Sequence, residues 1–191
     1  MFPWKNNDLN DLKTKLEDLP KESKKLIVVD GIYSMKGSIA PIKELNEIAE
    51  STNSYIFIDD AHGFGTVGPR GLGILDLLNI KNNDRLIYLG SFSKSASNPV
   101  GFVSCSKILA DYLDASAGFL IYSGPPSNLH VATSLRHLIN FDTQKYKGLR
   151  YKIYSLSKWA HKECLNHNIK VLSTCGFYDL AQHPHTKKRA S

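Results

Sequence analysis

The sequence has few cysteines and no long hydrophobic run, and both absences limit what the protein can be. Its 191 residues include three cysteines, none in a CxxC pair, which gives no disulfide framework and fits a reducing compartment. No apolar run approaches the ~18 residues that a membrane-spanning helix needs. The first ten residues, "MFPWKNNDLN", lack the apolar segment of a secretory signal. We therefore expect a cytoplasmic protein without a membrane span.

Dense charge of one sign and metal-ligand clusters are also scarce. The formal net charge is +6, but lysines and arginines are scattered among acids, and the only dense basic cluster is "KKR" near the C-terminus. We interpret the surplus as solvated surface and expect no nucleic-acid partner. One group resembles a metal site, but its spacing carries the third side chain well away from the first around a helix. We expect helix surface or packing, and no metal, at His161, Cys164, His167 and Cys175.

What the sequence does have is a regular alternation of short apolar segments and amphipathic ones. The apolar segments, which predict strands, cover residues 25–30, 55–60, 85–92 and 100–106. The amphipathic segments, which predict helices, cover residues 7–20, 41–51, a short stretch around 75, 106–118, 129–139 and 144–167. Such alternation indicates an α/β fold with a mostly parallel sheet that helices cover on both faces.

Polar side chains follow three of the predicted strands, at the point where each strand ends. In open α/β sheets, ligands bind beyond the carboxyl ends of the strands, so we expect these groups to share one crevice. They are Asp30 with Ser34, then Asp59 with Asp60 and His62, then Ser91 with Ser93 and Lys94.

Two motifs at the second of these strand ends imitate nucleotide sites. "GFGTVG", residues 63–68, fits the GxGxxG dinucleotide fingerprint, but two acids precede it and "PRG" follows where a helix is required. "DDAH" is similar to the acidic box of DEAH-type helicases, which also need a phosphate-cradling GxxxxGKS/T loop that this sequence lacks. We therefore expect neither a nicotinamide cofactor nor a nucleotide-driven motor.

The segment "GSFSKS", which we expect to form a loop, surrounds Lys94 with small hydroxyl residues. Hydroxyls and backbone N–H groups can bind a phosphate while Lys94 presents an amine. Asp59 can hold a cationic nitrogen, and His62 can face an oxyanion. Phosphate, an amine-reactive aldehyde and a pyridinium nitrogen are the features of pyridoxal phosphate, which proteins bind through a lysine and an acidic partner. We expect Lys94 to be buried, because desolvation favours the neutral, nucleophilic amine.

Three segments together resemble a known family. "DGIYSMKGSIAPI", "FIDDAHGFGTVGPRGLG" and "GSFSKS" are similar, in order and spacing, to those of the α-oxoamine synthases, and the similarity extends over residues 7–172. It implies an aspartate-aminotransferase-like (fold type I) structure, pyridoxal 5'-phosphate as cofactor, and a homodimer with its active sites at the subunit interface. It also implies a reaction that condenses an amino acid with an acyl-CoA.

The resemblance also implies roles for individual residues. Lys94 matches the Schiff-base lysine, Asp59 the acid paired with the pyridinium nitrogen, and His62 the histidine near the phenolic oxygen. Ser91 matches a residue that binds the cofactor's phosphate, and Ser34 one that lies at the cofactor's polar edge.

Ser123, in "IYSGPP", matches a segment that reaches toward the partner subunit's phosphate. Asp60 matches an acid that varies in the family, and we assign it no chemistry. Family members are about twice as long, so we expect residues 1–143 to be a partial cofactor-binding domain and residues 144–191 an interdomain helix with the start of a small domain. Two alternatives stay open: an aminotransferase of the same fold, and a non-catalytic dimerisation subunit or inactive fragment.

Overall fold

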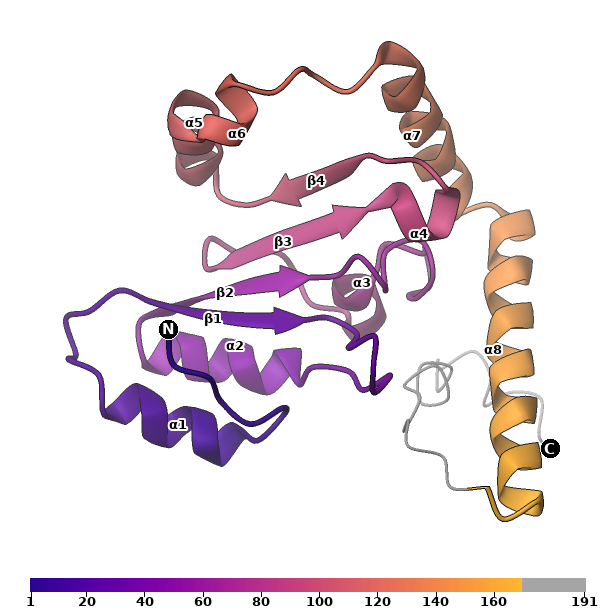
Figure 1. Ribbon diagram of the computed structural model, residues 1–191, viewed down its shortest axis with the longest axis horizontal. Helices are drawn as coiled ribbons and strands as arrows, with labels where there is room; N and C mark the ends of the chain where they lie inside the picture. The colour runs from indigo at the N-terminus through magenta and orange to yellow at the C-terminus, as the bar shows by residue number, and fades with distance from the viewer. Residues whose placement is uncertain (170–191) are drawn as a thin grey trace.

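The computed structural model describes residues 1–169 as an α/β fold built on a four-stranded sheet. The strands are β1 (Lys25–Asp30), β2 (Ser54–Asp59), β3 (Leu86–Ser91) and β4 (Gly101–Ser104), and they lie side by side in that order. The first three are parallel, and β4 runs antiparallel to β3 (Figure 1). The mostly parallel sheet expected from the sequence is therefore confirmed.

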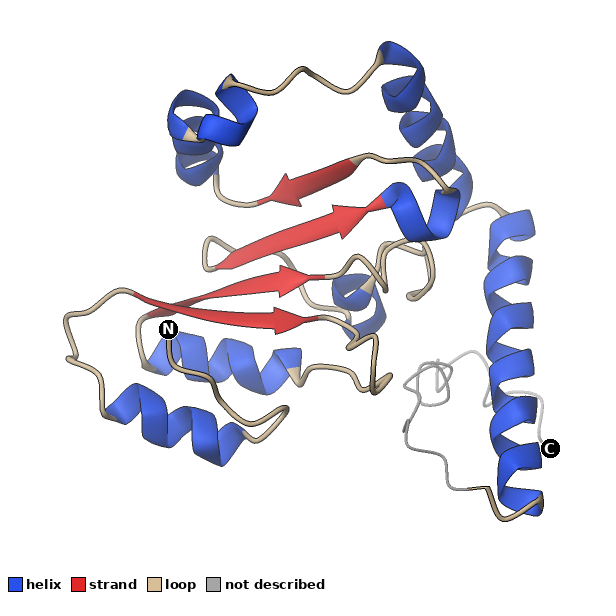
Figure 2. Cartoon of the chain, in the orientation of Figure 1, coloured by secondary structure: helices blue, strands red, loops and turns tan. Residues whose placement is uncertain are grey.

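Eight helices accompany the sheet in the described residues (Figure 2). They are α1 (Leu9–Glu17), α2 (Ile42–Ser51), α3 (Ile74–Leu78), α4 (Phe92–Ala96), α5 (Lys107–Ser116), α6 (Gly118–Ile121), α7 (Asn128–Phe141) and α8 (Gln144–Asn166). Several begin at side-chain caps: Asp8 accepts two backbone N–H groups of α1, and Ser106 accepts one of α5. Within residues 1–169, no helix combines the length and apolar character required to cross a bilayer.

Within residues 1–169, helices cover only one face of the sheet, which corrects the expectation of cover on both faces. The chain moves from β1 to β2 to β3 in one direction, and right-handed crossovers in one direction put every connecting helix on the same side. Figure 1 shows α1 and α2 along that side. The residues that form the shared core include Leu12, Leu16, Ile27, Val29, Ile42, Leu45, Ile56, Ile58, Ile74, Leu86 and Tyr88.

The opposite face of the sheet is apolar and open. Alternation along the strands sends Leu26 and Val28 of β1 to that face, where 54% and 58% of their surface is exposed. Tyr55 of β2 pairs with Leu26, and Val103 of β4 pairs with Leu89; they are 40% and 45% exposed. We call this surface, made by Leu26, Val28, Tyr55 and Val103, the open sheet face.

An aromatic cluster fixes the carboxyl end of the sheet. The ring of Phe64, in the loop after β2, meets three others edge to face: Phe92 of α4 at 5.1 Å, Phe102 of β4 at 4.9 Å and Phe141 of α7 at 5.5 Å between centroids. Edge-to-face pairs contribute ~0.5–1.5 kcal/mol each beyond the burial of their area. The cluster therefore holds α4 and the loop after β2 in a fixed relation.

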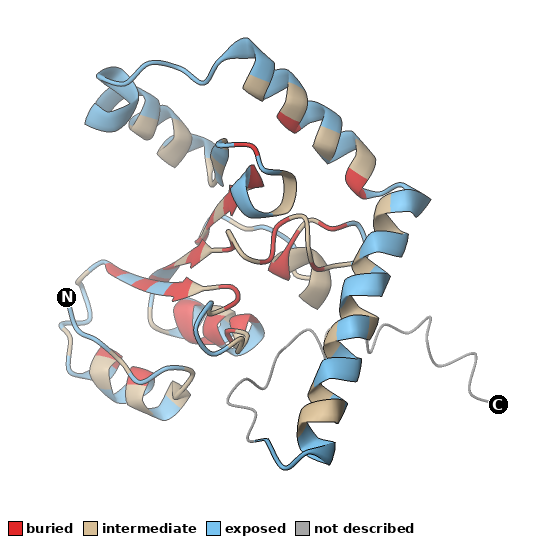
Figure 3. Cartoon of the chain, turned by 45° about the vertical axis from the view of Figure 1, so that its right-hand side comes forward, coloured by how far each residue is buried: buried red, intermediate tan, exposed pale blue. Residues whose placement is uncertain are grey.

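Three of the helices after β4 pack loosely. In the described residues, α5, α6 and α8 contain no buried side chain, and Figure 3 draws the long helix α8 in pale blue and tan without red. Arg150 of α8 donates hydrogen bonds to the carbonyl oxygens of Phe141 (2.8 Å) and Pro69 (3.0 Å). The division at residues 143 and 144 falls between α7 and α8, and it stays a prediction because residues 170–191 lie outside the described part.

Candidate active site

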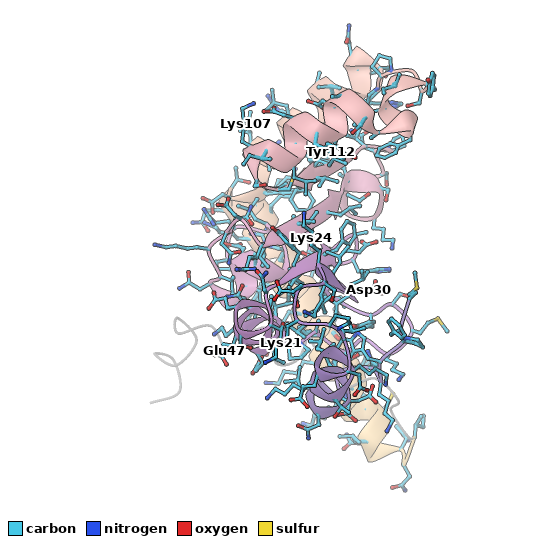
Figure 4. The ribbon with its side chains drawn as sticks, turned by 90° about the vertical axis from the view of Figure 1, so that its left-hand side faces the viewer. Lys21, Lys24, Asp30, Glu47, Lys107 and Tyr112 are labelled. Carbon is cyan, nitrogen blue, oxygen red and sulfur yellow. The ribbon has the colours of Figure 1, made fainter. Side chains whose placement is uncertain are left out.

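The polar strand ends meet at one edge of the sheet. Asp30 of β1 pairs in register with Asp59 of β2, and Asp59 pairs with Leu89, two residues before Ser91. Residues paired across a sheet, or two apart along a strand, share a face. Asp30, Asp59 and Ser91 therefore share the edge and face of the sheet on which the predicted crevice was expected. Asp30 and Lys24, which lies just before β1, are labelled in Figure 4.

Lys94 contacts His62 at this edge. The Lys94 Nζ lies 2.5 Å from the His62 Nε2, so two groups separated by 32 residues meet directly. The structure corrects two expectations about Lys94. It lies on the short helix α4 and not in a loop, and its side chain is exposed and not buried, because no described segment covers it.

Asp59 is half-buried at the same edge of the sheet. Its Oδ1 accepts the N–H of Ala61 at 3.0 Å, which shapes the turn leading to His62. Burial, and secondarily the charge of Asp59, raise the pKa of Asp30 above its ordinary value, while His62 and Lys94 oppose this rise. Asp59, His62 and Lys94 thus all lie within electrostatic reach of one carboxylate, which brings the predicted amine and acid to the same edge.

The three serine candidates differ in position. Ser91 caps α4: its Oγ accepts the N–H of Ser93 at 3.2 Å and lies 2.8 Å from the Ser93 hydroxyl. Ser34 is exposed in the turn after β1. Ser123 follows α6, where its hydroxyl donates to the carbonyl of Phe119. Figure 1 draws α6, which precedes Ser123, near the carboxyl end of β4 and away from α4, the helix that carries Lys94.

The glycine-rich segment after His62 forms turns. Gly65 and Gly68 adopt φ values of 81° and 90°, which favour glycine, and the next helix, α3, begins only at Ile74. No helix follows Gly68 directly, as the sequence predicted. In residues 1–169, no three His, Cys, Asp or Glu side chains are grouped as metal ligands, and Cys175 lies outside that range.

The structure contains a cavity of about 840 Å³ that is separate from these groups. It lies between α3, β3, β4 and α7 on the helix-covered face, and Leu72, Tyr88, Phe102 and Leu135 contribute to its lining. Asp59, His62 and Lys94 do not line it. The candidate residues therefore lie at the sheet edge and not in this cavity.

Sequence reasoning gave Asp60 no role, yet its side chain is fully buried. Its Oδ2 accepts the N–H of Ile74 at 2.6 Å and the hydroxyl of Tyr88 at 2.7 Å. Burial raises the pKa of Asp60 to about 6, and both hydrogen bonds oppose this rise. The signal that could have found it is Tyr88, a hydroxyl on the inward-facing side of an apolar strand.

We expect Asp60→Asn to remove a pH-dependent loss of stability. Because the folded-state pKa of Asp60 lies above its usual 3.8, ionisation disfavours the folded chain, and its stability falls as the pH rises from about 4 through about 6. The full effect is about 3 kcal/mol by linkage. Thermal unfolding at pH 5 and pH 8 tests this: the variant is expected to gain stability over the wild type at pH 8. Parallel pH profiles would contradict the assignment.

Known proteins resemble this chain in sequence. The sequence model of the family "Aminotransferase class I and II" matches residues 2–185. The 8-amino-7-oxononanoate synthase of Helicobacter pylori is 36% identical over 177 residues, which cover 93% of this chain and 46% of that protein. The serine palmitoyltransferase of Sphingobacterium spiritivorum is 38% identical over 138 residues, 72% of this chain and 34% of that protein.

Solved structures agree with these sequence relatives. A structure titled as SPT with PLP superposes with a TM-score of 0.78 at 27% identity, over 88% of this chain and 42% of that one. The serine palmitoyltransferase of Sphingomonas wittichii gives 0.74 at 26% identity, over 84% and 39%. This chain thus spans about half the length of its relatives or less. The strand-end groups meet at one edge, and the family model matches nearly the whole chain. The chain therefore belongs to the aminotransferase class I and II family and resembles its α-oxoamine synthases.

Proposed function

We propose that this chain carries the cofactor-binding residues of a pyridoxal-phosphate-dependent acyltransferase that condenses an amino acid with an acyl-CoA. The observation that carries the proposal is the contact between Lys94 and His62 on the sheet edge that also holds Asp59. The family supports the cofactor, and the α-oxoamine synthases among its relatives support the acyl transfer.

The residues at the edge fit pyridoxal phosphate by the chemistry of their donor groups. Lys94 offers an exposed amine to an aldehyde, and Asp59 offers a carboxylate to a ring nitrogen. His62 offers a ring N–H to a phenolic oxygen. Ser91 offers a hydroxyl to a phosphate, and Ser34 offers one to the polar edge of the ring.

The bound cofactor supplies a conjugated ring that accepts electron density from the substrate's α-carbon. Asp59 would hold the ring nitrogen of the cofactor, and its negative charge would favour the protonated form of that nitrogen. With an amino acid and the cofactor bound, Lys94 would be the amine that moves protons at the substrate's α-carbon. His62, which touches Lys94, is placed to hold a proton beside that amine.

The proposal includes a homodimer in the cytoplasm, with Ser123 serving the partner's site. Ser123 follows α6, which Figure 1 draws away from the helix α4 that carries Lys94, and this separation supports a role outside its own subunit. The amino acid and the acyl chain are substrates of the whole protein, of which this chain spans about half the length.

An assay of coenzyme A release tests the reaction type. The chain is incubated with pyridoxal phosphate, a panel of amino acids and acyl-CoA thioesters of several lengths, and free thiol is measured. We expect thiol release that requires both the cofactor and an amino acid and is absent in Lys94→Ala. Amine exchange between an amino acid and a keto acid, without thiol release, would instead identify an aminotransferase.

A further inference from the structure

Asp60 lies back to back with Asp59. Its backbone N–H donates to the carbonyl of Leu89 at 2.9 Å, so pairing between β2 and β3 continues through Asp60. Successive side chains in an extended strand point to opposite faces. Asp59 consequently faces the candidate active site, while Asp60 points into the core on the other side.

The carboxylate of Asp60 joins three segments. Its Oδ2 receives hydrogen bonds from the first residue of α3, Ile74, and from Tyr88 of β3. The backbone carbonyl of Asp60 accepts the N–H groups of Gly63 and Phe64, and these two hydrogen bonds close the turn that carries His62. One residue therefore links the end of β2, the middle of β3 and the start of α3.

Glycines make room for this carboxylate from three sides. A Cβ built on Gly31 would lie 2.5 Å from the Asp60 Oδ1, and one on Gly63 would lie 2.1 Å from the same oxygen. A Cβ on Gly73 would lie 2.0 Å from the Oδ2. No side chain larger than hydrogen fits at these positions while the carboxylate stays in place.

The arrangement is unfavourable as packing alone. The Oδ1 of Asp60 is buried and has no hydrogen-bond partner, and an unsatisfied buried carboxylate oxygen costs stability. An apolar core residue avoids that cost. The two hydrogen bonds from Tyr88 and Ile74 instead hold the carboxylate, and with it the backbone after β2, against β3 and the start of α3.

We propose that Asp60 is a positioning residue for the candidate active site: its carboxylate fixes the turn between Asp59 and His62, so that both stay aligned with Lys94. The turn is short, and Asp59 and His62 lie on either side of the anchor, so a shift at Asp60 moves both. This inference rests on the proposed function, because the alignment matters for holding pyridoxal phosphate.

Cofactor affinity, measured apart from activity, tests the inference. Pyridoxal phosphate is titrated by absorbance, and covalent capture at Lys94 is quantified by borohydride reduction and peptide mass mapping, under conditions where near-UV circular dichroism shows each variant folded. Asp60→Ala is expected to raise the dissociation constant about tenfold, the size typical for residues that orient a direct ligand contact. Asp60→Asn is expected to restore most of the affinity, because its amide oxygen can accept the same two bonds.

Two further variants test the same anchor while leaving Asp60 itself in place. Tyr88→Phe removes one donor with little change in volume, and we expect it to weaken capture by less than Asp60→Ala does. Gly63→Ala pushes on the Oδ1, whereas the matched control Gly148→Ala meets open space. Gly63→Ala is expected to weaken capture in the wild type but add little in Asp60→Ala, which has room for the Cβ.

The outcomes separate the inference from the function it rests on. If the wild type captures the cofactor at Lys94 and folded Asp60→Ala captures it equally well, Asp60 serves the fold alone and the inference is wrong. If Asp60→Ala does not fold, unchanged capture in both Tyr88→Phe and Gly63→Ala overturns the inference in the same way. If the wild type captures none, the proposed function and the inference both fall.

Discussion

Replacing Lys94 with alanine is expected to abolish covalent capture of pyridoxal phosphate. Lys94 is the lysine that meets His62 at the sheet edge, and its amine is the group that we propose to bond to the aldehyde. We expect the absorbance band near the edge of the visible range to disappear. Borohydride reduction followed by peptide mapping is expected to find the label at Lys94 in the wild type and none at this site in the variant.

A surface lysine provides the matched control, because aldehydes react slowly with any exposed amine. Lys43 is an exposed lysine on a helix, as Lys94 is, and it lies on α2. Lys43→Ala is expected to keep the wild-type band and stoichiometry. Equal bands in Lys94→Ala and Lys43→Ala would reject the site.

Asp59→Asn is expected to spare cofactor binding and to slow proton removal from the substrate's α-carbon by about 100-fold or more, the scale on which loss of a preorganised electrostatic partner acts. A neutral amide cannot hold a ring nitrogen in its protonated form as a carboxylate does. Deuterium exchange at the α-carbon of an amino acid, followed by NMR, measures the rate. A titration with pyridoxal phosphate measures binding separately.

Asp30→Asn is the comparison for this second result. Asp30 is the register partner of Asp59 and ends the neighbouring strand, so its replacement removes a carboxylate of the same kind from the same edge. We expect its effect on exchange to be less than about tenfold, since its charge acts from a greater distance than the partner of the ring nitrogen. A loss in Asp30→Asn as large as that in Asp59→Asn would mean that charge at the edge, and not contact by Asp59, drives the chemistry.

The elements of the fold could be predicted because their signals are local. The runs "KLIVVD" and "YIFIDD" are apolar and short, and the strands lie within one residue of them. The amphipathic segment 144–167 similarly predicts α8, which ends one residue earlier. Parallel strands end at a common edge, so the meeting of Asp59, His62 and Lys94 also followed from sequence order.

What could not be predicted depends on tertiary arrangement. The apolar sequence of β1 suggests burial on both faces, but the one-directional strand order puts its helices on one side and leaves Val28 open. Lys94 is exposed because no segment within residues 1–169 covers it, and the residues around Lys94 in the sequence give no sign of this. The burial of Asp60 could not be predicted because two adjacent acids look alike in the sequence, and nothing local indicates that one faces the site and the other the core.

The open sheet face bears on how this chain behaves in a test tube. Contiguous apolar surface of this kind is uncommon on proteins that remain monomeric. Leu26, Val28, Tyr55 and Val103 expose apolar side chains to water on the face of the sheet that also holds Asp59. We expect the 191-residue chain to self-associate, to adsorb to chromatography resins and to bind fluorescent dyes such as ANS, unless another protein surface covers the open sheet face. A protein that increases the solubility of this chain when the two are mixed is therefore a candidate for the partner that covers the open sheet face.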